Sequence, residues 1–344
     1  MDGAVSARGA KRINLALQGG GAHGAFTWGV LDRLLEEERL EIAGISGTSA
    51  GALNGAALKA GLAQNGRDGA KARLEGVWRA VGAVTDERFV PWLASVSPTF
   101  VSAAIEMSPF YQAADMLSRA VSPYMRPPGA DMPLRRIVEG LDFGSVCAAG
   151  GPALTVCATN VRTGKIKLFQ GEDITVEAIL ASACLPTIYP AVRIGDEHYW
   201  DGGYTGNPAL FPLYEADLPR DVVIVNINPL VREELPVSAR DIQNRINEIS
   251  FNTSLLRELR AIDFVQRLLH AGKIEPGAMK DVAIHMIADD ALMRQLSVAT
   301  KIVPSPALLW QLRAAGRRAA DAFLAAHWDD IGTRSSIDLR EMFA

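Results

Sequence analysis

Two short apolar runs, each followed by glycines and then by a helix-forming segment, constrain the fold of this chain most. Residues 13–17 have the sequence Ile-Asn-Leu-Ala-Leu, and residues 41–45 have the sequence Glu-Ile-Ala-Gly-Ile. A short apolar run bounded by glycine is typical of a buried parallel strand. The segments that follow, 24–37 and 50–60, carry apolar or small residues at helical spacing. This alternation predicts an α/β fold with a mostly parallel central sheet flanked by helices.

The rest of the chain continues this pattern around one interruption. Residues 1–11 are expected to form a disordered tail, and residues 12–344 one domain. Seven prolines interrupt the mostly helical residues 68–140, which predicts a helical cap inserted over one end of the sheet. Residues 240–344 are expected to be mainly helical. Further strands are predicted at 153–159, 165–169, 192–194, 198–200, 222–228 and 282–287, and further helices at 175–183, 255–269 and 306–326.

Composition excludes several classes of protein. Of the 344 residues, 49% are hydrophobic and 22% are charged, so the chain can bury a substantial core. The net charge of −4 argues against a nucleic-acid partner, which would require a basic face. No run reaches the roughly 18–20 apolar residues of a membrane-spanning helix, and no signal-peptide core is evident. We therefore expect a cytoplasmic protein.

The cysteines and histidines do not form a recognisable metal-binding pattern. Three cysteines, Cys147, Cys157 and Cys184, are too few for a disulfide framework, and their apolar neighbours predict unreactive core thiols. No clustered Cys/His spacing of the kind that binds zinc is present. We expect neither a metal nor an organic cofactor.

The first candidate site is the loop Gly19-Gly20-Gly21-Ala22-His23-Gly24, between the first predicted strand and its helix. Glycines allow positive φ and bring bare N–H groups close to a ligand. The helix N-terminus behind them adds a partial positive charge. Such a loop suits an anion, either a dinucleotide pyrophosphate or a reaction oxyanion, and a purely structural turn can have the same sequence.

The second candidate site is Gly47-Thr48-Ser49-Ala50-Gly51, which matches G-x-S-x-G between the second predicted strand and its helix. A nucleophile on a sharp strand-to-helix turn needs small neighbours because its own backbone is strained and its flanks are crowded. Gly47 and Gly51 meet this need, and the N–H of Ala50 would face the oxygen of a tetrahedral intermediate. A five-residue match also arises by chance, so the predicted strand before it and the predicted helix after it are the stronger support for a nucleophile turn.

The third candidate site is Asp201-Gly202-Gly203, directly after the strand-like Tyr199-Trp200. An acid at the end of a strand, followed by two glycines, lies on an accessible turn rather than within the sheet. Taken alone, the same sequence is typical of an ordinary Asp-Gly turn.

In this order, the three motifs resemble the patatin-like phospholipase family. The resemblance extends over residues 13–212 and includes the segments 181–186 and 199–204. It implies a patatin-like three-layer sandwich and lipid acyl hydrolase activity. The implied substrates are phospholipid, lysophospholipid or another acyl ester.

Carried over by position, the resemblance implies a Ser–Asp dyad, with Ser49 as the nucleophile and Asp201 as the base. An acyl-enzyme would form, and water activated by Asp201 would release the fatty acid. The N–H groups that would hold the oxyanion belong to Gly19, Gly20, Gly21 and Ala50. The glycines that support the motifs are Gly24, Gly47, Gly51, Gly202 and Gly203. The family often has Lys or Arg where this chain has His23, which we interpret as a residue that shapes the loop.

Other functions remain as alternatives. An α/β-hydrolase esterase would use a Ser-His-Asp triad, and His270, His285 and His327 lie downstream of Ser49 as that order requires. His285 falls in an apolar run and is predicted to lie in the core, whereas His270 and His327 end amphipathic helices. A nucleotide-binding module would use the glycine loop, but the second strand lacks an acidic ribose partner at its end. An inactive scaffold is disfavoured because all three motifs are intact.

Residues 89–125 are rich in Phe, Trp, Tyr, Met and proline. One hypothesis is an acyl-chain pocket or lid that makes transient contact with a membrane surface. The other is ordinary core packing between helices.

Overall fold

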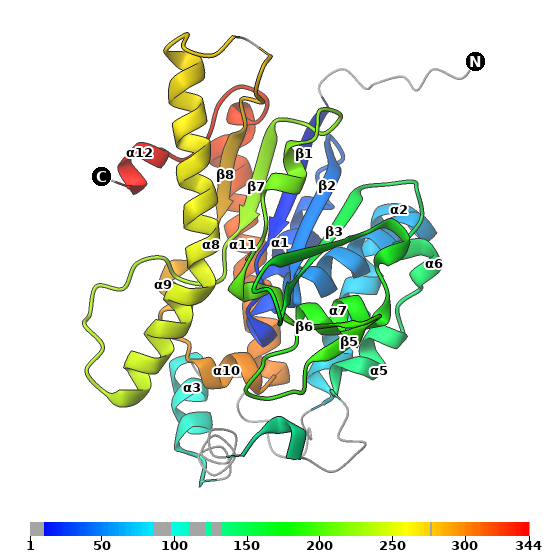
Figure 1. Ribbon diagram of the computed structural model, residues 1–344, viewed down its shortest axis with the longest axis vertical. Coiled ribbons are helices and arrows are strands. Elements are labelled where there is room, and N and C mark those ends of the chain that lie inside the picture. Colours follow the sequence, from blue (N-terminus) through cyan, green and yellow to red (C-terminus); the bar gives the residue numbers. More distant parts are fainter. Residues whose placement is uncertain (1–9, 85–97, 110–120, 126–131, 276, 344) are drawn as a thin grey trace.

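The computed structural model describes residues 10–84, 98–109, 121–125, 132–275 and 277–343, and their strands form one eight-stranded sheet (Figure 1). The strands are β1 (Lys11–Leu17), β2 (Leu40–Thr48), β3 (Ala153–Asn160), β4 (Ile166–Gln170), β5 (Val192–Ile194), β6 (Glu197–Asp201), β7 (Asp221–Val225) and β8 (Ala283–Ile287). Their order across the sheet is β5-β6-β3-β2-β1-β7-β8, and β4 also pairs with β3.

The centre of the sheet is parallel, as the sequence predicts. Strands β3, β2, β1, β7 and β8 run in the same direction, whereas β4, β5 and β6 pair antiparallel at one side. Parallel neighbours need crossover connections, which are usually helices. The carboxyl ends of β1, β2 and β7 therefore meet at one edge, where open α/β sheets bind their ligands.

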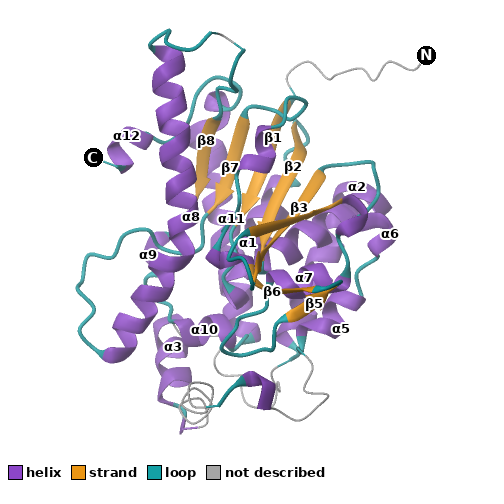
Figure 2. Ribbon diagram, in the orientation of Figure 1, coloured by secondary structure: helices purple, strands orange, loops and turns teal. Residues whose placement is uncertain are grey.

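Helices cover both faces of the sheet, which gives the predicted three-layer sandwich (Figure 2). In β1, Ile13, Leu15 and Leu17 belong to one core, whereas Ala16 belongs to the other. This alternation follows from the two-residue period of a strand. The helices of the first core are α1 (Gly24–Leu34), α2 (Ala50–Gly82), α7 (Val176–Ser182) and α11 (Pro306–His327), and α8 (Ala239–His270) covers the second core.

Two helices are longer than the sequence predicts. Helix α2 does not end at Gly61 but turns at Asn65 and Gly66, whose φ/ψ values are not helical, and continues to Gly82. Gly61 instead allows the two halves of α2 to pack closely, because an added Cβ there would collide with Ala70. Helix α8 begins at Ala239, well before the predicted residue 255. Ile242, Ile246 and Ile249 recur at helical spacing in its first turns, but they are exposed and belong to neither core.

The predicted tail and cap are only partly described. Strand β1 begins at Lys11, so this residue belongs to the sheet and not to the predicted tail, and residues 1–9 lie outside the described residues. Residues 68–82 belong to α2, and the predicted lid at 89–125 lies largely outside the described residues. The described remainder of 98–139 forms α3 (Pro98–Met107), η4 (Pro123–Met125) and α5 (Leu134–Glu139).

Among the described helices, none has the length and apolar character needed to cross a membrane.

Helices α1 and α11 approach so closely that their backbones touch. An added Cβ on Gly29 of α1 would collide with the carbonyl of Arg313, and one on Gly316 of α11 would collide with the carbonyl of Phe26. The glycine loop leads directly into α1, so this contact also fixes one side of the candidate site.

Replacing Gly29 with alanine should lower the free energy of unfolding by about 1–3 kcal/mol, because the two helix backbones must separate. Chemical denaturation measures the change. Gly76→Ala is the matched control, because Gly76 also lies in a helix but has nothing within 4 Å of an added Cβ. The control should stabilise the protein by roughly 0.5–1 kcal/mol. Equal effects of the two substitutions would contradict this account of the helix contact.

Candidate active site

Ser49 lies on the sharp turn between β2 and α2. Its φ of 54° and ψ of −119° make it the only non-glycine residue with positive φ among the described residues. A backbone in such a region is strained by about 1–3 kcal/mol and persists only when its surroundings hold it there. The N–H of Ser49 donates a hydrogen bond of 2.8 Å to Ser182 Oγ, which helps to hold the turn.

The glycines of the G-x-S-x-G motif have a steric explanation. An added Cβ on Gly51 would collide with the carbonyl of Leu17 in β1, and one on Gly47 would lie 2.6 Å from the carbonyl oxygen of Gly51. The turn therefore needs residues without a side chain at positions 47 and 51, where β1, β2 and α2 approach each other closely. Gly24 plays the same part across the loop, because its Cβ would lie 2.5 Å from that of Ala50.

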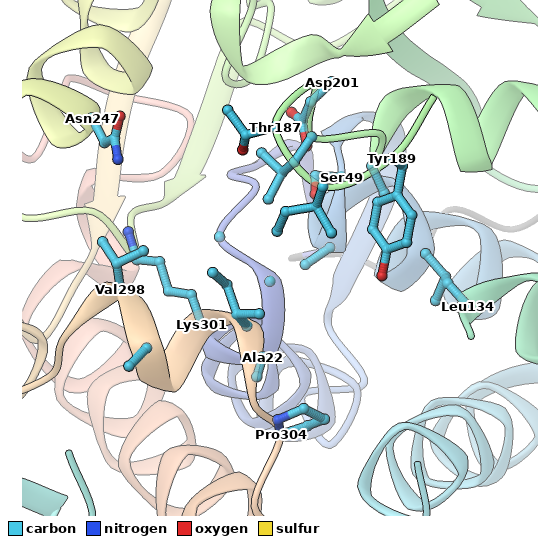
Figure 3. Close-up of a pocket in the computed structure, with 18 of the residues that line it drawn as sticks. Ala22, Ser49, Leu134, Thr187, Tyr189, Asp201, Asn247, Val298, Lys301 and Pro304 are labelled. Carbon is cyan, nitrogen blue, oxygen red and sulfur yellow. The ribbon is translucent and has the colours of Figure 1, made fainter. Parts of the chain in front are cut away.

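Asp201 ends β6 and lies beside Ser49 (Figure 3). Its Oδ1 accepts a hydrogen bond of 2.7 Å from Gly203 N–H, and its own N–H donates to the carbonyl of Cys184 at 2.8 Å. The side chain is 1% exposed. Burial raises the pKa of Asp201 to about 7, although hydrogen bonds from Gly203 N–H and the Ser49 hydroxyl lower it in part.

The two glycines after Asp201 are also required by packing. An added Cβ on Gly202 would collide with the carbonyl of Cys157 in β3, and one on Gly203 would collide with the ring of Phe251 in α8. The turn that carries the carboxylate is thus held between the sheet and α8.

Two amides of the glycine loop and the first amide of α2 have no hydrogen-bond partner in the part of the chain that is described. The N–H groups of Gly20, Gly21 and Ala50 donate no hydrogen bond to any residue that the structure describes. Gly19 differs, because its N–H donates to Asn207 Oδ1 at 2.7 Å. This contact does not fit the predicted role of Gly19 as an oxyanion donor. An added Cβ on Gly19 would lie 2.8 Å from that of Ser49, so this glycine instead allows the loop to lie close to the serine.

Side chains from distant parts of the chain fix the glycine loop. Asn228 Nδ2 donates to the carbonyl of Gly19 at 2.8 Å and to Gln18 Oε1 at 3.1 Å. Lys301 Nζ donates to Asn228 Oδ1 at 2.7 Å. Nothing in the sequence marked Asn207, Asn228 or Lys301 as supporting residues. Of the residues that hold the site in place, only Ser182 lay in a segment, 181–186, that the sequence had singled out.

His23 is buried under the loop and does not line the cavity. Its Nε2 lies 2.8 Å from Thr300 Oγ1. Burial, together with the positive charge of Lys301, holds the pKa of His23 well below its usual range. A neutral, buried histidine bonded to Thr300 fits the interpretation of His23 as a residue that shapes the loop.

Ser49 and Asp201 line a cavity of about 1100 Å³. Gly20, Gly21 and Ala50 also line it, so the serine, the carboxylate and the unbonded amides face the same space. Apolar side chains line it from α2, α5, the loop after α7, α8 and α10 (Val298–Ile302): Leu53, Trp78, Val81, Leu134, Ile137, Leu185, Ile188, Phe251, Val298, Ala299 and Ile302.

The downstream histidines are not part of this site. None of the five histidines, all of which the structure describes, lines the cavity. His285 is buried in β8 with its Nε2 3.0 Å from Asp221 Oδ1, as predicted for a core residue. His327 Nδ1 bonds to Asp330 Oδ2 at 2.8 Å, and the His270 side chain is mostly exposed. Within the described residues, a Ser-His-Asp triad therefore has no histidine in position.

The cysteines are unbridged, and no cluster of metal-binding side chains is found among the described residues. Cys157 and Cys184 are buried, and burial raises the pKa of the Cys184 thiol to about 12. These thiols remain protonated near neutral pH and pack as small apolar groups.

The chain belongs to the patatin-like phospholipase family, whose model matches residues 15–217, more than half of the chain. The matched segment contains Ser49, Asp201 and the glycine loop. No match is found among curated protein sequences.

Two solved structures are distantly similar. VipD from Legionella pneumophila is 15% identical with a TM-score of 0.33, and the match covers 90% of this chain and 67% of VipD. The ExoU–SpcU complex from the type III secretion system of Pseudomonas aeruginosa is 16% identical with a TM-score of 0.30, and the match covers 93% of this chain and 60% of the other.

The raised pKa of Asp201 predicts a dependence of stability on pH. The native state retains a proton that the unfolded chain releases, so the free energy of unfolding should fall as pH rises from about 4 to about 7. Asp201→Asn should remove a fall on the order of 3 kcal/mol. Chemical denaturation at a series of pH values measures the difference between the two proteins.

Glu258 provides the matched comparison, because burial also raises its pKa to about 7 while the N–H groups of Leu210 and Phe211 bond to it. Glu258→Gln should remove the part of the pH dependence of stability that comes from Glu258 and leave the part that comes from Asp201 unchanged. Parallel curves for the wild type and Asp201→Asn would show that the Asp201 carboxyl titrates normally.

Proposed function

We propose that this protein is a serine lipid acyl hydrolase that cleaves carboxylic esters of the phospholipase A or lysophospholipase type. One observation carries the proposal: the Ser49 hydroxyl and the buried Asp201 carboxylate meet in one cavity, beside the unbonded amides of Gly20, Gly21 and Ala50. Membership of the patatin-like phospholipase family supports the lipid substrate.

In the first step, Asp201 takes the proton of the Ser49 hydroxyl while Oγ attacks the carbonyl carbon of the ester. The carbonyl π electrons move to oxygen, which becomes the oxyanion of a tetrahedral intermediate. When this intermediate collapses, the bond to the leaving alcohol breaks, and the alcohol takes the proton from Asp201. Ser49 is left as an acyl ester.

The N–H groups of Gly20, Gly21 and Ala50 stabilise the oxyanion. One such donor is typically worth about 2.7–4 kcal/mol in the transition state. The N-terminus of α2, which begins at Ala50, adds a partial positive charge at the same place. Because these groups are held by packing before substrate arrives, they need not reorganise during the reaction.

Burial makes Asp201 a better base than an ordinary carboxylate. A free aspartate with a pKa near 3.9 binds a proton weakly. At a pKa of about 7, Asp201 accepts a proton more readily and is still about half ionised near neutral pH. A histidine is therefore unnecessary for proton transfer.

In the second step, a water molecule takes the place of the alcohol. Asp201 removes its proton, the hydroxide attacks the acyl carbon, and the fatty acid leaves as Ser49 regains its proton. The apolar side chains of α2 and α5 give the acyl chain a favourable environment next to the serine.

Ser49→Ala should reduce kcat/KM for a short-chain ester at least about 10³-fold, and Asp201→Asn at least about 10²-fold, because each removes a group that acts directly on the reacting atoms. The wild-type rate should rise with pH through an apparent pKa near 7, since only ionised Asp201 is a base. Steady-state hydrolysis measured across pH tests both expectations.

Ser46→Ala is the matched control. Ser46 is buried in β2, three residues before Ser49, and its Oγ lies 3.9 Å from Cys157 Sγ rather than in the cavity. This variant should retain most of the activity. A Ser49→Ala protein that folds normally and still hydrolyses the ester at the wild-type rate would refute the proposal.

A further inference from the structure

The cavity has a polar side that hydrolysis at Ser49 does not use. Opposite the apolar side chains of α2 and α5, it is lined from α8, from α10 (Val298–Ile302) and from the loop after β7. The polar side chains among them, which we call the polar wall, are Asn228, Gln243, Asn244, Asn247 and Lys301. Phe251, Val298, Ala299 and Ile302 from the same two helices are apolar. In Figure 3, Lys301 and Asn247 lie on one side of the glycine loop, and Ser49 and Asp201 lie on the other.

Lys301 provides the only basic side chain among the described residues that line the cavity. It reaches this position because α10 packs on η1 (Gly21–His23), where the carbonyl of Lys301 leaves no room for a Cβ on Gly21. The ammonium group donates to Asn228 Oδ1 at 2.7 Å. Its other two N–H donors have no hydrogen-bond partner in the described part of the chain.

Lys301 makes no ion pair with any residue that the structure describes. Glu248, the nearby buried carboxylate, is bonded to Arg232 at 2.6 Å and to Arg245 at 3.2 Å, and it makes no salt bridge with Lys301. Burial lowers the pKa of Lys301 to about 8, so the amine is still mostly protonated near pH 7. The ammonium group therefore lies at the cavity with no direct ion-pair partner among the described residues, although the charge of Glu248 still acts on it.

Two amide side chains extend this feature along α8. Asn244 and Asn247 are half-buried, and they lie three residues apart, on one face of the helix. Their side chains make no hydrogen bond with another described residue, yet both line the cavity. Half-buried amides without partners are favourable only if water or a ligand satisfies them.

We propose that Lys301, Asn244 and Asn247 form a phosphate-binding subsite that holds the head-group phosphate of a glycerophospholipid while its acyl ester lies at Ser49. A phosphate oxygen accepts hydrogen bonds from an ammonium group and from amide N–H groups, and its charge compensates that of Lys301. The inference rests on the proposed function and names its substrate class. The three residues lie beyond residue 217, outside the segment that the family model matches.

A purely supporting role for Lys301 is the competing explanation. Lys301 bonds to Asn228, which in turn bonds to the carbonyl of Gly19. If Lys301 only held the glycine loop, its loss would weaken the reaction of every ester alike. If Lys301 binds phosphate, its loss should weaken the binding of a ligand that carries a phosphate more than that of the same ligand without one.

Binding to the Ser49→Ala protein tests the subsite without turnover, so the result does not depend on hydrolysis. The probes are a short-chain lysophosphatidate and the monoacylglycerol with the same acyl chain, both below their micelle concentrations. Lys301→Met should weaken lysophosphatidate binding at least about tenfold, and the ratio of the two affinities should fall by a similar factor. Lys301→Arg should restore most of the ratio.

Two further variants complete the design. Asn247→Leu leaves Lys301 and its bond to Asn228 intact and should also lower the affinity ratio, which keeps the test valid if Lys301→Met folds poorly. Lys273→Met is the matched control, because Lys273 is exposed and follows the opposite end of α8. It should leave the ratio unchanged.

Equal weakening of both ligands by Lys301→Met and by Asn247→Leu would overturn the proposal in favour of loop support. An unchanged ratio would also overturn it. Inorganic phosphate separates the two sources of the anion: it should compete only weakly, because it lacks the acyl chain. Competition by free phosphate as strong as that by lysophosphatidate would contradict a lipid head-group site.

Discussion

The strained turn at Ser49 is the constraint on which the candidate site depends. Its positive φ is accompanied by close packing on both sides: an added Cβ on Gly51 would collide with the carbonyl of Leu17, and one on Gly19 would lie 2.8 Å from the Cβ of Ser49. The bond from Ser49 N–H to Ser182 Oγ secures the same turn from α7. Because these contacts come from the parallel sheet and its helices, the fold itself holds Ser49 in this turn.

The parallel strands and the turns that carry Ser49 and Asp201 could be predicted from the sequence because the constraints that shape them are local. Glycines flank Ser49 and follow Asp201 for steric reasons that act within a few residues, and apolar runs mark the parallel strands of the sheet. The order of the motifs then indicates which turns meet. The boundaries of α2 and α8 were less predictable, since Gly61 serves a close helix contact and the apolar residues in the first turns of α8, Ile242, Ile246 and Ile249, are exposed rather than part of a core.

The supporting residues could not be predicted because their roles arise only in three dimensions. Asn207, Asn228 and Lys301 are each remote in sequence from the glycine loop that they support. Gly19 is the opposite case. Its place in the glycine motif predicted an N–H free to bind the oxyanion, but that N–H donates to Asn207 Oδ1. The family segment contains Ser49 and Asp201, and α8 and α10 also line the cavity around them. Residues beyond 217 therefore line the candidate site as well.

The most direct test of the central claim is the site of covalent modification by a fluorophosphonate, a reagent that reacts with activated serines. Mass spectrometry of the labelled and digested wild-type protein should find one adduct, on the peptide that contains Ser49, and Asp201→Asn should label far more slowly. Labelling of a different serine, or equal labelling of a folded Ser49→Ala protein, would contradict the assignment of Ser49 as the nucleophile.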